Sequence, residues 1–492
     1  MGASAVESVL AVDFGTTTTC AALARGGSVR RLREPVGDGW AWPSAVLLSG
    51  NRPYVGSAAE QRRLLDPAAY RDELKRTLGR GVPVDLGGRG HPAGLLVSLL
   101  LQAVRAEAER ANGGPVDRSV LTVPAAYGPA DPRGEELLDA ARRAGLPRPE
   151  LCPEPVAGAL APLAGGPLPP GSTVLVHDLG GGTFDTALVR LPGEGGRPGP
   201  AVLAHDGEEY GGRDFDALVY AELLDRGGPE LTALLPPEDA GPGDAGPGGG
   251  GPGGGGPERA GPGGAGPERA LPGETALRHR IQLLDLARRL KHRLAAESAP
   301  AEVFAPAGRV LGLHRDRFLR QAEPLYARTT ACCARLLAEA ALLDTAGSPP
   351  RPDAVVVIGG SSRLPGLVEH VEQALGLPVV LAEDPRTAVA EGAAAWAAAR
   401  VVRTVEAVGP VPERTPLRWP LPPGGAVLVE WSVGPGRRYP AGAVLGRARA
   451  EDGSLLHLSA PAPGRVRAQH ARPGERVRDG DWLVTVEQHH EG

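Results

Sequence analysis

Lysine is nearly absent from this chain. Only Lys75 and Lys291 occur among its 492 residues, so nearly all of the 53 basic residues are arginine. A Walker A phosphate-binding loop is excluded, because neither lysine follows a glycine or precedes serine or threonine. The net charge of −5 also lacks the basic excess typical of nucleic-acid binding, so we expect no nucleic-acid partner.

Cysteine and long apolar runs are scarce too. The four cysteines are too scattered for a disulfide framework, and no C-x-x-C pair indicates zinc. The first residues lack the basic and apolar regions of a signal peptide. Apolar stretches such as 95–101 fall well short of the roughly 18 residues that a membrane helix needs. We therefore expect a reduced, cytoplasmic protein with no membrane partner.

Aromatic residues are few, with 6 Trp, 7 Tyr and 5 Phe, while Gly (71) and Pro (51) are abundant but unevenly spread. Gly and Pro dominate residues 236–273, where GPERA occurs at 256–260 and again at 266–270. Such a low-complexity stretch cannot bury a core. Because an α/β pattern resumes after it, we expect a disordered insertion within a domain.

The other residues predict an α/β domain followed by a small all-β domain. Residues 8–235 alternate β-branched runs with helical stretches. Further patterns predict a strand at 354–358 and helices at 93–112, 275–296 and 315–345. We assign residues 1–400 to the first domain, 401–422 to a linker and 423–492 to the second domain.

Two segments share one design: a buried strand, an aspartate at its end, a glycine-rich turn with threonine, and a second strand. They are VLAVDFGTTTTCAAL at 9–23 and VLVHDLGGGTFDTALV at 174–189. Glycine lets the backbone approach closely, so N–H groups and Thr hydroxyls can bind phosphate oxygens. Asp13 and Asp178 can hold Mg²⁺ through water, because Mg²⁺ keeps much of its hydration shell. Two such hairpins facing each other would grip a polyphosphate from both sides.

A third glycine-bearing loop, IGGSSRLP at 358–365, follows the strand predicted at 354–358. Its Gly359, Gly360 and Ser361 would admit a flat base and ribose, and Arg363 could stack on the base or hold an α-phosphate. Glycine-rich turns are common in a chain with this composition. Three in this order, each after a strand, nevertheless indicate a nucleotide site.

Together these motifs resemble the seventy-kilodalton heat-shock protein (Hsp70, DnaK-type) chaperone family, whose ATPase has the two-lobed actin-like (ribonuclease H-like) fold. The resemblance covers about residues 8–400. It rests on the three loops and on five further motifs: LKRTLGR (74–80), VLTVPAAY (120–127), PEPVAGALA (153–161), YGGRDFD (210–216) and EDPRTAVAEGAAAWA (383–397).

The resemblance implies a role for each matching residue. Pro124 would change conformation with the nucleotide state, and Lys75 would position the γ-phosphate and the attacking water. Catalysis would involve Lys75, Glu154, Asp178, Thr183 and Asp185, with Mg²⁺ held through water by Asp13 and Asp178. ATP or ADP would be bound by Asp13, Gly15, Thr16, Thr17, Thr18, Gly180, Gly181, Gly182, Gly211, Gly212, Lys291, Gly359, Gly360, Ser361 and Arg363.

The two lysines of the chain match family positions, since Lys291 corresponds to the lysine that contacts adenosine. A compact ammonium that follows one phosphate is not equivalent to a planar guanidinium. The same helix departs from the family at Arg288, His292 and Ala295, and Arg386 replaces a common aspartate. These departures weaken the expectation of tight adenine-nucleotide binding. The 236–273 insertion likewise makes conventional exchange-factor binding doubtful.

The C-terminal part also departs from the family. Residues 401–419 lack the family's apolar-acidic linker, and no lid-like helical pattern follows. Instead Pro435-Gly436 recurs as Pro473-Gly474, within a repeat that resembles the two halves of a biotinyl/lipoyl-type barrel-sandwich hybrid. No lysine follows Lys291, so we expect no biotin or lipoate attachment. Either a non-carrier docking module or an unrelated small β-domain remains open.

The leading hypothesis is a Mg-ATP-dependent, chaperone-like ATPase of the Hsp70 family. It would hydrolyse ATP slowly and use its nucleotide state to switch an interaction with an unidentified client or partner protein. One alternative is a nucleotide-sensing scaffold that does not hydrolyse ATP. Another is a sugar or acid kinase of the same superfamily, which LKRTLGR and PEPVAGALA fit less well.

Overall fold

The computed structural model divides the chain into two compact units, Met1–Val401 and Val402–Gly492. The expected disordered insertion at 236–273 lies outside the described residues except for its last two positions, as do residues 401–413 of the expected linker. The structure describes residues 7–37, 39–50, 52–127, 131–194, 199–235, 272–343, 351–399 and 414–488.

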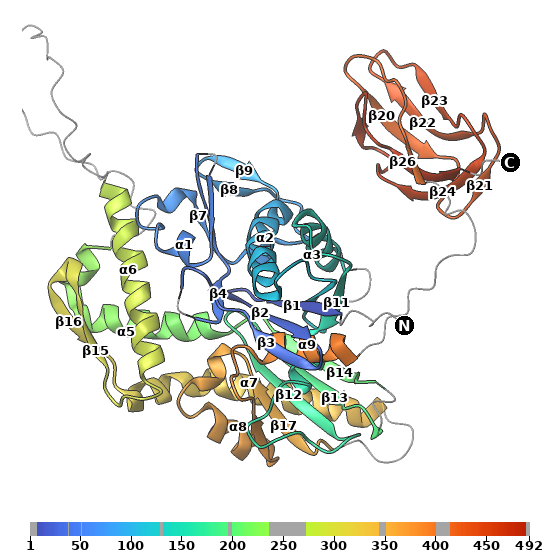
Figure 1. Ribbon diagram of the computed structural model, residues 1–492. Helices are drawn as coiled ribbons and strands as arrows, with labels where there is room; N and C mark the ends of the chain where they lie inside the picture. Colours follow the sequence, from blue (N-terminus) through green and yellow to red (C-terminus); the bar gives the residue numbers. More distant parts are fainter. Residues whose placement is uncertain are drawn as a thin grey trace, which may run out of the picture. The chain divides into compact units, whose positions relative to one another are not determined.

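Two β-sheets of the same topology form the centre of the first unit (Figure 1). In each, three consecutive strands form an antiparallel meander, and two further strands add in parallel beside its first strand. We call the parts built on them lobe I (residues 7–153) and lobe II (residues 173–381). The orders are β11-β10-β1-β2-β3 and β14-β13-β12-β17-β18.

Lobe I contains β1 (Ser8–Phe14), β2 (Thr18–Arg25), β3 (Ser28–Arg31), β10 (Arg118–Val123) and β11 (Pro149–Pro153), with β4 (Ala41–Pro43) paired to β2. Lobe II contains β12 (Thr173–Leu179), β13 (Phe184–Arg190), β14 (Ala201–Glu208), β17 (Ala354–Ile358) and β18 (Val379–Leu381). The strand predicted at 354–358 is therefore confirmed.

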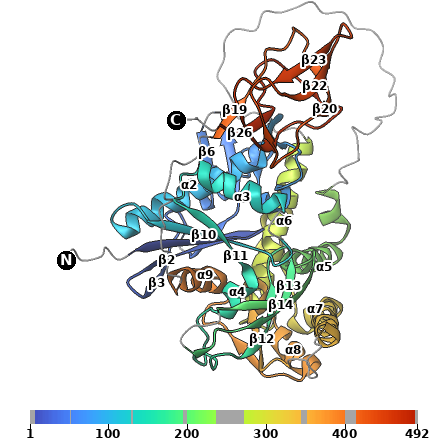
Figure 2. The same cartoon turned by 90° about the vertical axis from the view of Figure 1, so that its right-hand side faces the viewer.

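Helices α4 (Glu154–Ala159) and α9 (Ala388–Ala399) lie between the two sheets (Figure 2). One apolar cluster joins Val9 of β1, Val176 of β12 and Ala393 of α9. The two helices approach so closely that a Cβ on Gly392 would lie 1.8 Å from the carbonyl oxygen of Ala157. The alanine- and glycine-rich sequence at 388–399 fits this thin layer, because larger side chains would force the lobes apart.

Longer helices cover the outer faces of the sheets and bury two further apolar clusters. Helix α2 has the bounds predicted for it, and α6 and α7 match the helices predicted at 275–296 and 315–345 within three residues at each end. Helix α5 is kinked at Gly228, which precedes Pro229. The helices are α2 (Ala93–Asn112), α3 (Pro132–Arg143), α5 (Gly212–Ala233), α6 (Pro272–Arg293), α7 (Arg315–Leu343) and α8 (Leu367–Leu375).

Smaller elements complete each lobe. Lobe I adds a three-stranded sheet, β6-β5-β7, and a β8-β9 hairpin, while lobe II adds a β15-β16 hairpin. Their bounds are β5 (Val46–Ser49), β6 (Arg52–Val55), β7 (Tyr70–Arg71), β8 (Val84–Leu86), β9 (Arg89–His91), β15 (Ala301–Phe304), β16 (Arg309–Gly312) and α1 (Ser57–Glu60). Short 3-10 helices are η1 (Pro67–Ala69), η2 (Leu74–Thr77), η4 (Ala305–Ala307) and η5 (Gly360–Arg363).

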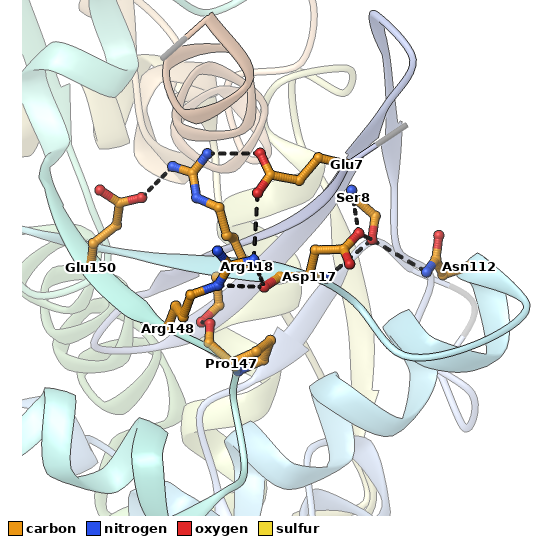
Figure 3. Close-up of polar contacts among 9 residues, drawn as sticks. Glu7, Ser8, Asn112, Asp117, Arg118, Pro147, Arg148 and Glu150 are labelled. Carbon is orange, nitrogen blue, oxygen red and sulfur yellow. Dashed lines mark hydrogen bonds and ion pairs between the residues drawn. The ribbon is translucent and has the colours of Figure 1, made fainter. Parts of the chain in front are cut away.

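A polar network fixes one end of the lobe I sheet (Figure 3). Arg118, only 2% exposed, lies between Glu7 at 3.1 Å and Glu150 at 2.5 Å. Beside it, Asp117 accepts hydrogen bonds of 2.8 Å from the backbone and the hydroxyl of Ser8. The Ser8–Asp117 bonds hold the start of β1 against the start of β10, and the Arg118–Glu150 pair joins β10 to β11.

The second unit consists of two four-stranded sheets, β19-β26-β24-β21 and β23-β22-β20-β25. In the sequence repeat, β20 corresponds to β24, β22 to β26, and β25 to β21. These three strands therefore follow one another in the same order in both sheets. The biotinyl/lipoyl-type fold stays a prediction. The equal strand order of the two sheets agrees with that fold, which consists of two similar halves. The strands are β19 (Arg414–Leu417), β20 (Ala426–Trp431), β21 (Arg438–Tyr439), β22 (Val444–Ala450), β23 (Leu455–Ser459), β24 (Gly464–Gln469), β25 (Arg476–Val477) and β26 (Val484–Gln488).

This unit begins earlier in the sequence than predicted. Strand β19 lies within residues 401–422, which the sequence assigns to a linker, and it pairs with β26. The sequence did not predict this strand because it contains Pro416, and proline within a short strand pattern argues against a strand except at the edge of a sheet. β19 is such an edge strand.

No described helix is long and apolar enough to cross a membrane. All four cysteines, Cys20, Cys152, Cys332 and Cys333, are buried and unbridged.

Candidate nucleotide site

The two glycine-rich turns contain the same backbone hydrogen bond, one in each lobe. In the β1–β2 hairpin, Gly15 N–H donates to the carbonyl of Thr18 over 3.1 Å. In the β12–β13 hairpin, Gly180 N–H donates to the carbonyl of Thr183 over 3.0 Å. The shared strand topology therefore presents the same loop twice, once from each lobe.

The two loops also touch each other. A Cβ on Gly181 would lie 2.1 Å from Thr17 Oγ1, and one on Gly182 would lie 2.9 Å from Thr16 Cγ2. Any side chain at these positions would collide with the opposite loop. The glycines at 181 and 182 thus allow the loops to close on the same space.

A cavity of 650 Å³ lies between the loops and extends toward α6 and η5. Most of the residues predicted to bind nucleotide or to act in catalysis line it. They are Asp13, Gly15, Thr16, Thr17, Thr18, Lys75, Glu154, Asp178, Gly180, Gly181, Thr183, Gly212, Lys291, Gly359, Gly360, Ser361 and Arg363.

Three predicted residues do not line this cavity. Gly182 belongs to the second loop but does not line the cavity, and its carbonyl accepts a 2.7 Å hydrogen bond from Arg76. Gly211 packs against the same loop, because a Cβ there would lie 2.8 Å from Gly180 O and from Gly182 N. Asp185 faces a second cavity described below.

A buried ion pair lies at the bottom of the cavity. Lys75 Nζ and Glu154 Oε1 are 2.6 Å apart. Burial opposes the charge of Lys75, but Glu154 and Asp13 outweigh burial and raise its pKa above the ordinary value. Lys75 is therefore held in its charged form.

Three further carboxyl groups surround this pair. Burial and the charge of Glu154 raise the pKa of Asp13 to about 6, although Thr122 donates a 2.9 Å hydrogen bond to it. Burial, with Glu154 as the next cause, also raises the pKa of Asp185 to about 6. Burial and the same Glu154 charge raise the pKa of Asp178 well above its ordinary value.

Four carboxyl groups thus share one ammonium. Asp178 lies opposite Asp185 in the β12–β13 register, so the two repel each other when both are ionised. Among the described residues, no group of three His, Cys, Asp or Glu side chains is placed to hold a metal ion directly. This donor set favours a hydrated divalent cation, whose charge would relieve the repulsion.

The hydroxyl of Thr17 is a buried polar group without a hydrogen-bond partner among the described residues. It lies in the first loop at the cavity wall. An unsatisfied buried hydroxyl costs free energy. A ligand oxygen between the two loops would satisfy it.

The third loop packs against the second. Gly359 has φ +88°, and a Cβ there would lie 2.4 Å from Asp178 Oδ1. Ser361 Oγ donates to Gly180 O over 2.9 Å, and Gly212 N–H donates to the same carbonyl over 2.9 Å. The N–H of Gly212 is therefore already hydrogen-bonded within the protein. What Gly212 gives the cavity is space, because it has no side chain.

The end of the cavity at α6 is rich in basic side chains. Lys291 Nζ lies 2.8 Å from Asp216 and donates to Gly212 O over 3.0 Å. Arg288 lies 3.2 Å from Asp216, so Lys291 and Arg288 of α6 contact the same acid. His292, Ala295, Arg363 and Arg386 also line this end, and Arg386 is paired to Asp384 at 2.9 Å.

Sequence reasoning did not assign a role to several lining residues. Asp216 lies in the motif YGGRDFD, which was recognised, but its partnership with Lys291 depends on α5 packing beside α6. Arg213 reaches the cavity and pairs with Asp72 at 2.9 Å and with Glu73. Pro385 and Val389 lie in the recognised motif at 383–397 but were given no role, and Glu60 had no signal in the sequence.

A two-lobed α/β unit with facing phosphate-type loops defines the class of nucleotide-binding proteins with an actin-like fold. Residues 81–227 match the family model described as Hsp70 protein. The chain is 31% identical over 407 residues to the chaperone protein HscA homolog of Azotobacter vinelandii, covering 78% of this chain. The chain thus contains an Hsp70-type domain and is similar to an Hsp70-family chaperone over most of its length.

The chain spans only 56% of the length of that relative. A second model, for a family of unknown function (DUF7159), matches residues 314–408. This second match covers α7 to α9 and describes no activity.

Proposed function

We propose that this protein binds ATP with Mg²⁺, hydrolyses it slowly, and uses the nucleotide state to switch an interaction with a client or partner protein. The observation that carries this proposal is the placement of Lys75 and Glu154, with Asp13 and Asp178, at the point where two glycine loops meet. Nothing in the packing of a core requires a lysine and several acids at one buried point.

The triphosphate fits the end of the cavity where the loops meet. There the backbone of Gly15 and Gly181 and the free hydroxyl of Thr17 face one space. Lys75 places a positive charge beside that space, where negative charge develops on the γ-phosphoryl group. The base and ribose would then lie toward α6 and Arg363, as the resemblance to the family implies.

Magnesium would be held through water by Asp13 and Asp178, and when bound it would neutralise charge on the phosphate oxygens. The chain's own residues position the reactants. Glu154 fixes the ammonium of Lys75 through its 2.6 Å contact, and Asp185 lies beyond Thr183, where an attacking water is expected. Catalysis by positioning and electrostatics is typical of phosphoryl transfer.

A chaperone-like role is proposed from the relative, whose name states that activity. The two lobes can move relative to each other, and the position of both would depend on ATP, since each contributes one loop to the same site. The partner is proposed to be a protein. The unit at 402–492 has no lysine and thus no site for biotin or lipoate.

The first experiment is single-turnover hydrolysis of ATP with Mg²⁺, comparing the native chain with Lys75→Ala. Arg89→Ala is the matched control, because Arg89 is an exposed basic residue of β9 that lines neither cavity. We expect the native chain and the control to release phosphate and Lys75→Ala to lose at least about 100-fold in rate. Calorimetric ADP binding by each variant checks that the site remains folded.

The same experiment separates the second candidate, a sensing scaffold that binds ATP without cleaving it. The replacement of a usual acid by Arg288, and of a usual serine by Ala295, favours altered nucleotide affinity. ATP binding without phosphate release by the native chain would establish this scaffold and refute the ATPase. Absence of any ATP binding would refute both.

A further inference from the structure

A second cavity, of 710 Å³, lies beside the nucleotide cavity and shares part of its wall. Thr16, Lys75 and Thr183 line both cavities. Since these residues stand where the two glycine loops meet, the second cavity opens behind the position proposed for the γ-phosphate. Asp185 and Pro124, which do not reach the first cavity, line the second.

The wall of this second cavity carries three arginines: Arg76, Arg80 and Arg133. Arg76 donates to Gly182 O over 2.7 Å, and Arg133 lies 3.9 Å from the centre of the Tyr127 ring. Arg80 is exposed and forms no ion pair with any residue that the structure describes. Its guanidinium is therefore free to attract an anion.

Acidic residues also line the cavity, but three of them are paired. Asp131 contacts Arg133 at 2.7 Å, Asp206 contacts Arg335 at 2.6 Å, and Glu208 contacts Arg328. Their charges are largely compensated by these partners. Lys75 is already paired to Glu154, so Arg80 marks the place on this wall where positive charge is not cancelled by an acid among the described residues.

The chemistry of hydrolysis requires a space on this side. An oxygen of water attacks the γ-phosphorus while the bond from phosphorus to the β-bridging oxygen breaks, giving ADP, inorganic phosphate and a proton to solvent. Attack and departure are in line, so water must stand on the side of the phosphorus opposite ADP. ADP meanwhile fills the first cavity and blocks that way out.

We infer that the second cavity admits the attacking water and releases inorganic phosphate while ADP is still bound. This inference rests on the proposed ATP hydrolysis. It adds a phosphate-binding passage lined by Arg76, Arg80 and Arg133, with Ala126 at its exposed edge. Phosphate would then leave before ADP.

The test uses the full chain and two variants of exposed residues, Arg80→Glu and Ala126→Trp. Arg80→Glu places an acid in the passage, and Ala126→Trp places a bulky ring at its edge. Arg89→Glu on β9 is the control, since it makes the same change of charge outside both cavities. Quenched-flow sampling measures ATP cleavage, a fluorescent phosphate-binding protein measures free phosphate, and a fluorescent ADP analogue measures ADP release.

We expect phosphate release to lag behind cleavage by about threefold or more in Arg80→Glu and Ala126→Trp, but not in Arg89→Glu. Phosphate that appears together with ADP in every variant would overturn the inference and leave the ATPase intact. Unchanged phosphate release in both passage variants would overturn it too. If the native chain cleaves no ATP, the proposed function fails and the passage with it.

Discussion

Arg63 of lobe I and Asp285 of helix α6 in lobe II form an ion pair between the two lobes. Their side chains are 12% and 18% exposed. Arg63 also contacts Glu60 at 2.9 Å, and Glu60 lines the cavity itself. This pair links the two lobes beside the nucleotide cavity.

Breaking this pair is expected to speed nucleotide release. In Arg63→Ala we expect ADP to dissociate about fivefold faster, because a partly buried ion pair contributes about 1 kcal/mol to the closed state. Stopped-flow displacement of fluorescent ADP measures the rate. Arg52→Ala, an exposed arginine of the neighbouring β6, is the control. The exchanged pair Arg63→Asp with Asp285→Arg would restore slow release, and its failure to do so would contradict an electrostatic latch.

The raised pKa values of the site predict how cation binding depends on pH. Asp13 and Asp185 have pKa values of about 6 in the folded chain, above the ordinary aspartate value. Folded protein therefore holds protons that the unfolded chain has lost, and these groups lower stability as pH rises from about 4 to about 6. A cation at the site would remove this penalty.

We therefore expect Mg²⁺ to raise the melting temperature more at about pH 7 than at about pH 5, because only the ionised carboxylates attract it. Differential scanning calorimetry with and without Mg²⁺ measures the difference. Asp13→Asn should reduce it, whereas substitution of an exposed acid such as Asp139→Asn should not. An equal effect of Mg²⁺ at both pH values would count against a cation at these aspartates.

The sequence predicted the three loops and the helix at 93–112 because local patterns specify them. Glycine after a strand-end aspartate marks a tight turn, and apolar periodicity marks a helix. Asp216 and Glu60 could not be assigned in this way, because their places depend on how α5 and α1 approach the cavity. Gly211 packs closely against the second loop, and its assignment to the phosphates stays a prediction. Contacts between segments far apart in sequence leave no local pattern.

The Arg118 network predicts a cost in stability away from the nucleotide site. Arg118→Met is expected to lower the free energy of unfolding by about 2 kcal/mol, because it removes the buried guanidinium that both Glu7 and Glu150 contact. Both acids are partly exposed, so the loss is smaller than for a fully buried pair. Urea unfolding measures it, with Arg142→Met, an exposed arginine paired to Asp139, as the control. Equal stability of the two variants would refute a structural role for Arg118.

Gly181 tests whether both loops must close on the same ligand. In Gly181→Ala the new methyl would meet Thr17 Oγ1, which lies only 2.1 Å from the Cβ position, so the loops must separate. We expect ATP affinity to fall by at least about tenfold, while the free energy of unfolding falls by only about 1–2 kcal/mol. Gly114→Ala is the matched control, because a Cβ at Gly114 meets no atom within 4 Å.

Calorimetric titration with ATP and Mg²⁺ measures this affinity, and urea unfolding shows whether the fold persists. The double variant Gly181→Ala with Thr17→Gly removes the opposing side chain and should recover part of the lost affinity, since the loops can approach again. Thr17→Gly alone must be compared, because it also deletes the hydroxyl proposed to contact phosphate. If Gly181→Ala binds ATP as tightly as Gly114→Ala, the two loops do not act on one ligand. The nucleotide would then lie nearer the basic end of the cavity at α6.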